Sequence, residues 1–258
     1  GIHCYLGLHV LAREIIFIYL ALAQVAAFGT AFAYLLGYEH NDVMTYLIAL
    51  LSTLSVSVFL AYANRFRLYI SQEALIGILF ALASAALILL LDQMSHGAEH
   101  LKHALVGQLL WVSWTDVGVV GLIYSAVGWV HFKFRKPLLQ SSFGGGSFWV
   151  WDLVFYGLFS VVITCSVQVA GVLLVFSLLV VPAFLSAIFL KSLTHRLISG
   201  WLGGITVCAI GLYLSYVLDL PAGALIVVCF TVLPVLIVLG VNLGFHRFFW
   251  QRLRGLKQ

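Results

Sequence analysis

Charged side chains are scarce in this sequence. Only 9% of its 258 residues are Asp, Glu, Lys or Arg, whereas 63% are hydrophobic and the mean hydropathy is +1.12. A soluble domain usually carries about a quarter charged residues. The chain therefore has too little polar surface to cover a water-facing globule, and we infer that lipid is its solvent. The net charge of +4 does not indicate nucleic-acid binding, because the basic residues are not gathered in one patch.

Cysteine motifs and catalytic motifs are absent as well. The four cysteines, Cys4, Cys165, Cys208 and Cys229, show no CxxC spacing, so we interpret them as small apolar packing residues rather than as disulfides or a metal site. The sequence contains no HExxH motif, no GxSxG motif and no pair of aspartates within an apolar stretch. Nothing in it therefore supports an intramembrane enzyme.

Long apolar runs dominate what is present. They cover residues 15–37, 43–62, 74–91, 117–132, 151–169, 171–190, 197–217 and 222–243. A run of about 20 apolar residues crosses a bilayer as a helix, which leaves no backbone group unpaired in lipid. Residues 1–12 are apolar too, and we expect them to be the end of one more helix that starts before Gly1. The sequence predicts an all-α fold, a polytopic transmembrane bundle of about eight or nine helices that forms a single transmembrane domain over residues 1–258.

Basic residues mark alternate gaps between these runs. One set of gaps holds all but one of the 13 Lys and Arg residues, namely Arg13, Arg65, Arg67, Lys133, Arg135, Lys136, Lys191, Arg196, Arg247, Arg252, Arg254 and Lys257. The other set is acidic and His-rich, with Lys102 as its basic residue. The positive-inside rule predicts that the first set is cytoplasmic. We therefore expect a multi-pass protein of the plasma or inner membrane with a cytoplasmic C-terminus.

No Lys, Arg, Asp or Glu lies at the centre of any run. Proton pumps and many ion-coupled carriers need such a buried ionisable relay. A passive conduit, or a permease driven by a separate protein, is therefore favoured. The polar residues inside the runs include Gln24 and Gln168, which either join helices or line a path. Pro182 lies in mid-run, where it frees a backbone carbonyl and favours a kink.

A histidine cluster stands out in the gap between residues 92 and 116. On a helix His96, His100 and His103 would share one face, with Glu99 beside them. Imidazole nitrogens and a carboxylate are preferred ligands for zinc and related ions. Two interpretations stay open, a metal site at the membrane edge and a solvated amphipathic linker.

Several stretches together resemble one known family. They are YLGLHVLAREIIFIYLALAQVAAFG (5–29), SQEALIGILFALASAAL (71–87), HGAEHLKHALVGQLLWVS (96–113), VQVAGVLLVFSLLVVPAFLSAIFL (167–190) and GLYLSYVLDLPAGALIVV (211–228). In this combination and order the chain resembles the permease subunit of ATP-binding-cassette importers for zinc, manganese or iron. The combination is specific, whereas any one apolar piece would be a weak signal.

The resemblance implies a homodimeric permease that takes a divalent metal ion as its substrate and holds no permanent cofactor. A separate cytoplasmic ATP-binding subunit would supply the energy, and an extracytoplasmic metal-binding protein would deliver the ion. The ATPase contact implied by the family falls after Pro182, at Lys191, His195 and Arg196. The ion is expected to pass near residues 15–37 and 151–190, with Tyr19, Gln24, Gln168 and Pro182 as candidate path residues.

The chain departs from the family at the centre of the expected path. Family members usually carry an acidic residue, often followed by a histidine, where this chain has Tyr19 and Gln24. Neither side chain is a strong ligand for a divalent ion. Because of this departure, the histidine cluster becomes a candidate for the place that receives the ion. Zinc is the metal that histidine suits best.

The sequence leaves two other transport functions open. The first is a permease for a larger metal chelate, a siderophore or a corrinoid, although the quoted motifs point away from it. The second is an ion-coupled carrier or channel, which the missing central charges disfavour.

Overall fold

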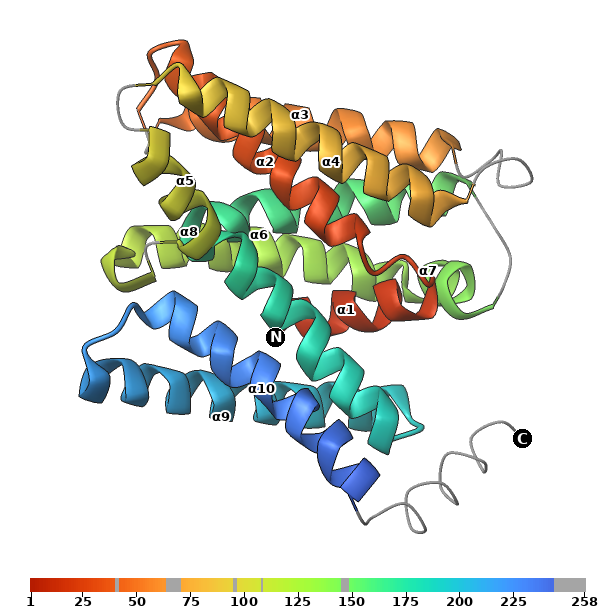
Figure 1. Ribbon diagram of the computed structural model, residues 1–258. Coiled ribbons are helices and arrows are strands. Elements are labelled where there is room, and N and C mark those ends of the chain that lie inside the picture. The colour runs from red at the N-terminus through yellow and green to blue at the C-terminus, as the bar shows by residue number, and fades with distance from the viewer. Residues whose placement is uncertain (40–41, 64–70, 95–96, 108, 145–148, 244–258) are drawn as a thin grey trace.

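The protein consists of α-helices that pack lengthwise into a bundle (Figure 1). The computed structural model describes residues 1–39, 42–63, 71–94, 97–107, 109–144 and 149–243. Within these ranges it contains α1 (Ile2–Ala12), α2 (Ile18–Leu35), α3 (Val43–Ala63), α4 (Gln72–Asp92), α5 (Gly97–Val106), the 3-10 turn η2 (Leu109–Trp111), α6 (Trp114–Lys133), α7 (Arg135–Phe143), α8 (Trp149–Phe189), α9 (Leu193–Leu218) and α10 (Ala222–Leu243). No strand occurs in the described ranges, so the predicted all-α fold is confirmed.

Six of the described helices, α2, α3, α4, α6, α8 and α9, are long and apolar enough to cross a membrane. They coincide with predicted runs, whereas α1 and the apolar part of α10, Ala222–Ile237, are shorter. The two runs expected at 151–169 and 171–190 form the single 41-residue element α8, which has a non-helical residue at Gly171. The bundle of membrane-spanning helices is therefore supported, while the number of eight or nine spans stays a prediction.

The two sets of gaps lie at opposite ends of the bundle. In Figure 1 the links between α2 and α3, α4 and α6, and α9 and α10 lie at one end, together with α5. The links between α1 and α2, α6 and α8, and α8 and α9 lie at the other end, together with α7. The first, which we name the acidic end, exposes Glu39, Asp42, Asp92, Glu99, Asp116 and Asp219. The second, the basic end, exposes Lys133, Arg135, Lys136 and Lys191.

Polar side chains define where individual helices begin. Ser113 accepts a hydrogen bond from the backbone N–H of Asp116 at 3.2 Å, and the Asp116 carboxylate accepts one from the backbone N–H of Ser113 at 3.0 Å. This capping box satisfies free N–H groups at the start of α6. At the start of α4 the Ser71 hydroxyl accepts from the N–H of Ala74.

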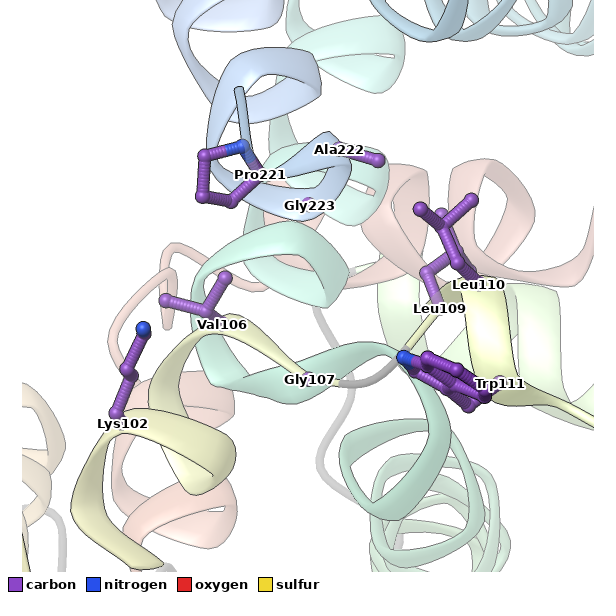
Figure 2. Close-up of a pocket in the computed structure, with 9 residues that line it drawn as sticks. All are labelled: Lys102, Val106, Gly107, Leu109, Leu110, Trp111, Pro221, Ala222 and Gly223. Carbon is purple, nitrogen blue, oxygen red and sulfur yellow. The ribbon is translucent and has the colours of Figure 1, made fainter. Parts of the chain in front are cut away.

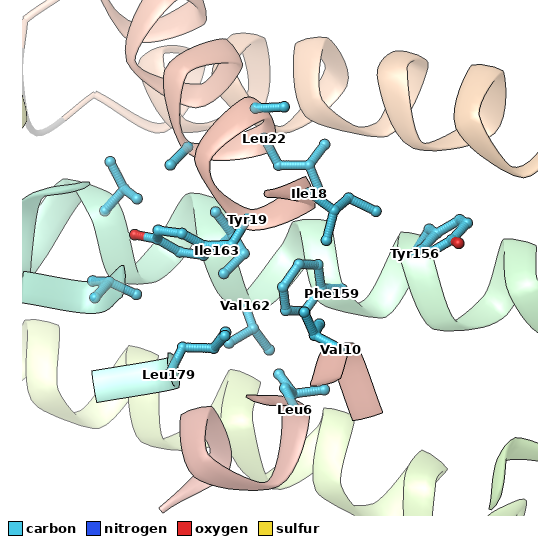
Figure 3. Close-up of a cluster of buried hydrophobic side chains, with 14 of the residues drawn as sticks. Leu6, Val10, Ile18, Tyr19, Leu22, Tyr156, Phe159, Val162, Ile163 and Leu179 are labelled. Atoms are coloured by element: carbon cyan, nitrogen blue, oxygen red, sulfur yellow. The ribbon is translucent and has the colours of Figure 1, made fainter. Parts of the chain in front are cut away.

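The core lies where α1, α2 and both halves of α8 meet. Leu6 and Val10 of α1 belong to one buried cluster with Phe159 and Leu179, which stand on the two sides of Gly171 (Figure 3). Because lipid is as apolar as these side chains, the cluster holds by close packing rather than by exclusion of water. Small residues bring helices together elsewhere, and a Cβ added at Gly29 would lie 2.7 Å from the Cα of Ala49 on α3.

The break in α8 depends on glycine. Gly171 has φ +75° and ψ +162°, and a Cβ there would lie 2.4 Å from the backbone nitrogen of Gly107. Gly107 also has a positive φ, of +74°, and its own Cβ would lie 2.3 Å from the carbonyl carbon of Ala170. Two backbone segments thus meet without side chains between them. In contrast, α8 keeps helical backbone angles through Pro182, so the interruption falls at the glycine and not at the proline.

We predict that Gly171→Ala destabilises the protein by about 1–3 kcal/mol or more, because alanine is strained at this φ and its Cβ collides with Gly107. Thermal unfolding in detergent measures the loss. Gly203→Ala is the matched control, since a Cβ on this α9 residue meets nothing within 4 Å and helical alanine is favoured over glycine by up to about 1 kcal/mol. Equal melting temperatures for the two variants would contradict this account of the break.

Candidate functional site

Tyr19, one of the predicted path residues, contacts α8 directly after its break. Its side chain is 0% exposed, and its hydroxyl donates a hydrogen bond of 2.8 Å to the backbone carbonyl of Val172. Figure 3 shows the ring of Tyr19 beside Ile163, inside the buried cluster. Val172 is the first residue after the break, so its carbonyl can also accept the helical bond from the N–H four residues on, and the contact gives the buried Tyr19 hydroxyl an acceptor that lipid could not supply. Tyr19 therefore ties α2 to α8.

The other three path candidates do not form one cluster with Tyr19. Gln24 lies on α2 and is 8% exposed. Gln168 precedes the break by three residues, and its Nε2 is a buried atom without a hydrogen-bond partner. Pro182 is buried farther along α8 and packs towards α9, where a Cβ added at Gly200 would lie 3.3 Å from its carbonyl oxygen. The structure thus brings Tyr19 and Gln168 to the break and leaves Pro182 at a helix contact.

A cavity of about 320 Å³ opens beside the break at the acidic end (Figure 2). The end of α5, the turn η2 and the start of α10 line it, through Lys102, Val106, Gly107, Leu109, Leu110, Trp111, Pro221, Ala222 and Gly223. Its lining is mostly apolar, with one charged side chain. The segments approach closely here, because a Cβ on Gly223 would lie 2.5 Å from the carbonyl oxygen of Val106.

Hydroxyl groups join α3 to the first half of α8. Thr53 bonds Thr164 over 2.9 Å between their hydroxyl oxygens, and Ser57 bonds Ser160 one turn farther along. All four side chains are buried. The Thr53 hydroxyl also lies 2.9 Å from the carbonyl oxygen of Leu50 in its own helix. This pattern is typical of interhelical polar contacts in membranes and does not by itself indicate an ion site.

A buried ion pair at the basic end escaped the sequence analysis. Arg13 Nη1 lies 2.5 Å from Asp152 Oδ1, and the two side chains are 4% and 3% exposed. The guanidinium also donates to Ser142 from Nε at 2.9 Å and to Ser141 from Nη2 at 3.1 Å, and it stacks on the Phe155 ring. The pair therefore joins α1, α7 and α8. Asp152 in the first turn of an apolar run was the signal that could have revealed it.

Three histidines inside the bundle, one partly buried and two buried, were also missed. His3 Nε2 lies 2.9 Å from Ser166 Oγ, which lies 2.7 Å from the hydroxyl of Tyr124, so that α1, α8 and α6 are joined. His9 and His131 lie farther towards the basic end and are also buried. The sequence analysis considered only carboxylates, lysine and arginine inside the runs, although imidazole is equally able to bind ions or protons.

Most of the predicted histidine cluster lies outside the described residues. His96 is not described, and neither are the side chains of His100 and His103. Glu99 is exposed on α5. Among the side chains that the structure does describe, no group of three or more His, Cys, Asp and Glu residues could hold a metal ion. The metal role of the cluster stays a prediction.

The predicted ATPase contact lies at the basic end. Lys191 falls in the short link between α8 and α9, and His195 lies in the first turn of α9, where both are exposed. Arg196 is partly buried, and its Nε donates a hydrogen bond of 2.7 Å to the carbonyl of Leu190. Arg196 thus closes the turn, while the other two face outward.

The chain is similar in sequence to several known membrane proteins. The sequence model of the ABC 3 transport family matches residues 1–241. A manganese transport system membrane protein of Synechocystis, MntB, is 30% identical over 178 residues, which cover 66% of this chain and 58% of that relative. The manganese transport system membrane protein MntC of Halalkalibacterium halodurans is 26% identical over 235 residues, 88% of this chain and 78% of the relative.

The chain is also similar to a probable iron transport protein and to a solved structure. A probable iron transport system membrane protein of Haemophilus influenzae is 27% identical over 172 residues, 64% of this chain and 60% of the relative. Among solved structures, PsaBC from Streptococcus pneumoniae in complex with Fab matches with a TM-score of 0.72 and 22% identity, covering 89% of this chain and 83% of that one. The structural match supports the helical fold.

We predict that Arg13→Gln and Asp152→Asn each destabilise the protein by about 3–5 kcal/mol, because each leaves the other charge buried and unpaired. The double variant should lose less than the sum of the two single losses, since the residues share one contact. Chemical or thermal unfolding measures all three. Lys136→Gln, on the exposed surface of α7, serves as the control and should change stability by less than about 0.5 kcal/mol. Additive losses would contradict the pairing.

Proposed function

Because this chain belongs to the ABC 3 transport family, we propose that it is the membrane subunit of an importer for a divalent metal ion. The family match over residues 1–241 is the observation that carries this function. Relatives named for manganese and iron transport agree with it. The chain itself is a transport subunit, and ATP hydrolysis belongs to a separate cytoplasmic partner.

Manganese is the ion that we rank first, followed by zinc and iron. The preference for zinc rested on histidines whose side chains lie outside the described residues, whereas two of the relatives are named for manganese. The amide oxygens of Gln24 and Gln168 are weak ligands, but as oxygen donors they suit manganese better than zinc.

The path is proposed to run beside the break in α8, where two copies of the chain would meet. Non-helical backbone at membrane depth is tolerated where protein buries it or where it lines a cavity, and Gly171 supplies such backbone. Tyr19 leaves the set of candidate ligands, because its hydroxyl is committed to Val172. Apolar side chains exposed on α4, α6 and α9 supply surface for lipid and for the second copy, Leu82, Leu122 and Leu202 among them.

Partner subunits are proposed to bind the two ends. The ATPase would bind the basic end through the turn that contains Lys191 and His195, with α7 beside it. The link from this turn to the core is direct, because α8 continues from the turn back to the break. The metal-binding protein would bind the acidic end, which exposes these carboxylates and contains the cavity of Figure 2.

Metal uptake in cells that express the chain with its ATPase and binding protein tests this function. We expect radioactive manganese to accumulate, with unlabelled Mn²⁺ competing better than Zn²⁺ or Fe²⁺. An ATPase subunit disabled in its nucleotide site should stop accumulation. Uptake that persists without ATP but stops when the proton gradient is collapsed would instead favour an ion-coupled carrier. Uptake of cobalamin or of a ferric siderophore without manganese uptake would favour a permease for a larger chelate.

Tyr19→Phe separates the structural role of this residue from a ligand role. The variant removes the buried hydroxyl together with its hydrogen bond to the Val172 carbonyl, and we expect it to lose roughly 0.5–1.5 kcal/mol of stability. Uptake per folded protein should stay close to that of the parent, because no ligand is removed. Tyr216→Phe, at a residue that is 87% exposed, is the control for both measurements. Abolished uptake in a Tyr19→Phe protein of unchanged stability would make Tyr19 part of the ion path.

A further inference from the structure

We propose that His9 and His131 form an internal binding site for a divalent transition-metal ion at the basic end of the bundle. His9 lies in the last turn of α1 and is 0% exposed, and His131 lies in the last turn of α6 and is 3% exposed. Their ring centroids are 6.3 Å apart. The Nε2 atom of each ring is buried and has no hydrogen-bond partner.

Two buried imidazole nitrogens without a partner, on neighbouring rings whose centroids are 6.3 Å apart, need a physical explanation. A buried polar atom that finds no partner costs about 1–3 kcal/mol. Besides these two nitrogens, three buried side-chain atoms of the described residues have no hydrogen-bond partner, Glu73 Oε2, Ser84 Oγ and Gln168 Nε2, and they belong to separate side chains elsewhere in the bundle. A ligand shared by the two Nε2 atoms accounts for both of them at once.

The hydrogen bond of His131 sets its ring in the form that binds metals. Its Nδ1 lies 3.0 Å from the carbonyl oxygen of Val127. Because a carbonyl only accepts, Nδ1 carries the proton and Nε2 keeps its lone pair. An imidazole held by an Nδ1–H bond to a backbone carbonyl is the arrangement found repeatedly behind metal-bound histidines.

His9 can adopt the same form without moving its backbone. Its Nδ1 lies 2.7 Å from Ser142 Oγ, which also accepts a hydrogen bond from Nε of Arg13. A hydroxyl can donate to Nδ1 or accept from it, so Ser142 is compatible with either tautomer of His9. When Nδ1 donates, Nε2 of His9 also has a free lone pair, and both rings offer one to the same ion.

The spacing and the surroundings suit an ion of zinc size. A zinc–nitrogen bond of about 2.0–2.1 Å puts the centroids of two ligating imidazoles roughly 5 to 6 Å apart, slightly less than the distance found here. The rings of Tyr5 and Phe155 flank both histidines. The nearby positive charge of Arg13 is paired with Asp152, which reduces its repulsion of a cation.

Two imidazoles bind an ion more weakly than the three or four protein ligands of ordinary zinc sites. Weak binding suits an ion that stays briefly and then leaves, as passage through a membrane protein requires. The inference stands on the geometry of α1 and α6 and does not depend on the proposed import function. Metal binding by the isolated chain and metal uptake by the complex are therefore separate results.

Zinc titration of the full chain in lipid nanodiscs tests the site. The parent for this experiment carries Asn at the histidines outside the described side chains, so that they add no binding: His40, His96, His100, His103 and His246. Calorimetry with Zn²⁺ alone should detect one site per chain. His9→Asn and His131→Asn should each weaken it at least tenfold, while Asn keeps a polar atom near the Nδ1 position. His195→Asn, an exposed histidine at the same end, should bind as the parent does.

Zinc binding that is unchanged in both variants, or absent from the parent, would overturn the proposal and leave the two rings as packing residues. Size-exclusion profiles and melting temperatures establish that the variants fold. If they do not fold, Cu²⁺ bound to the parent replaces them as the probe. Its electron paramagnetic resonance spectrum should then show coupling to two imidazole nitrogens, and a spectrum without nitrogen coupling would equally overturn the site.

Discussion

Lipid offers no hydrogen bonds, and this constraint shapes the whole protein. Every backbone polar group inside the membrane must find its partner within the chain. Helices satisfy it along their length, so the difficult point is the break at Gly171 in α8. There the hydroxyl of Tyr19 donates a hydrogen bond to the carbonyl of Val172, and the backbone of Gly107 lies directly against the break. Tyr19 thus joins α2 to α8 next to the break.

Charge follows the same constraint. Among the described residues, the exposed carboxylates gather at one end of the bundle and the exposed basic groups at the other, where water and headgroups can solvate them. Glu14 at the basic end and Lys102 at the acidic end are the exceptions. The charged pair that is buried, Arg13 and Asp152, is compensated internally and lies near the basic end. The turn at Lys191 and α7, which are proposed to bind the ATPase, lie at the same end as this pair. A partner that binds this end can therefore act on α1 and α8 directly.

Much of the fold could be predicted from the sequence, because apolar length and the distribution of lysine and arginine are local properties. The runs at 43–62 and 74–91 correspond closely to α3 and α4. The site was harder, because it depends on contacts between distant residues. Tyr19 and Val172 are 153 positions apart, and nothing near Tyr19 in the sequence reveals its partner. Arg13 was correctly placed in a basic gap, yet its burial against Asp152 depends on how α1 and α8 pack.

The arrangement in the membrane is tested most directly by labelling from one side. Lys136→Cys places a thiol on α7 at the basic end, and Asp219→Cys places one between α9 and α10 at the acidic end. A membrane-impermeant maleimide applied to intact cells should label Asp219→Cys above the background of the native cysteines. It should label Lys136→Cys only after the membrane is opened. Labelling of Lys136→Cys in intact cells would contradict the orientation, and with it the assignment of each partner to its end.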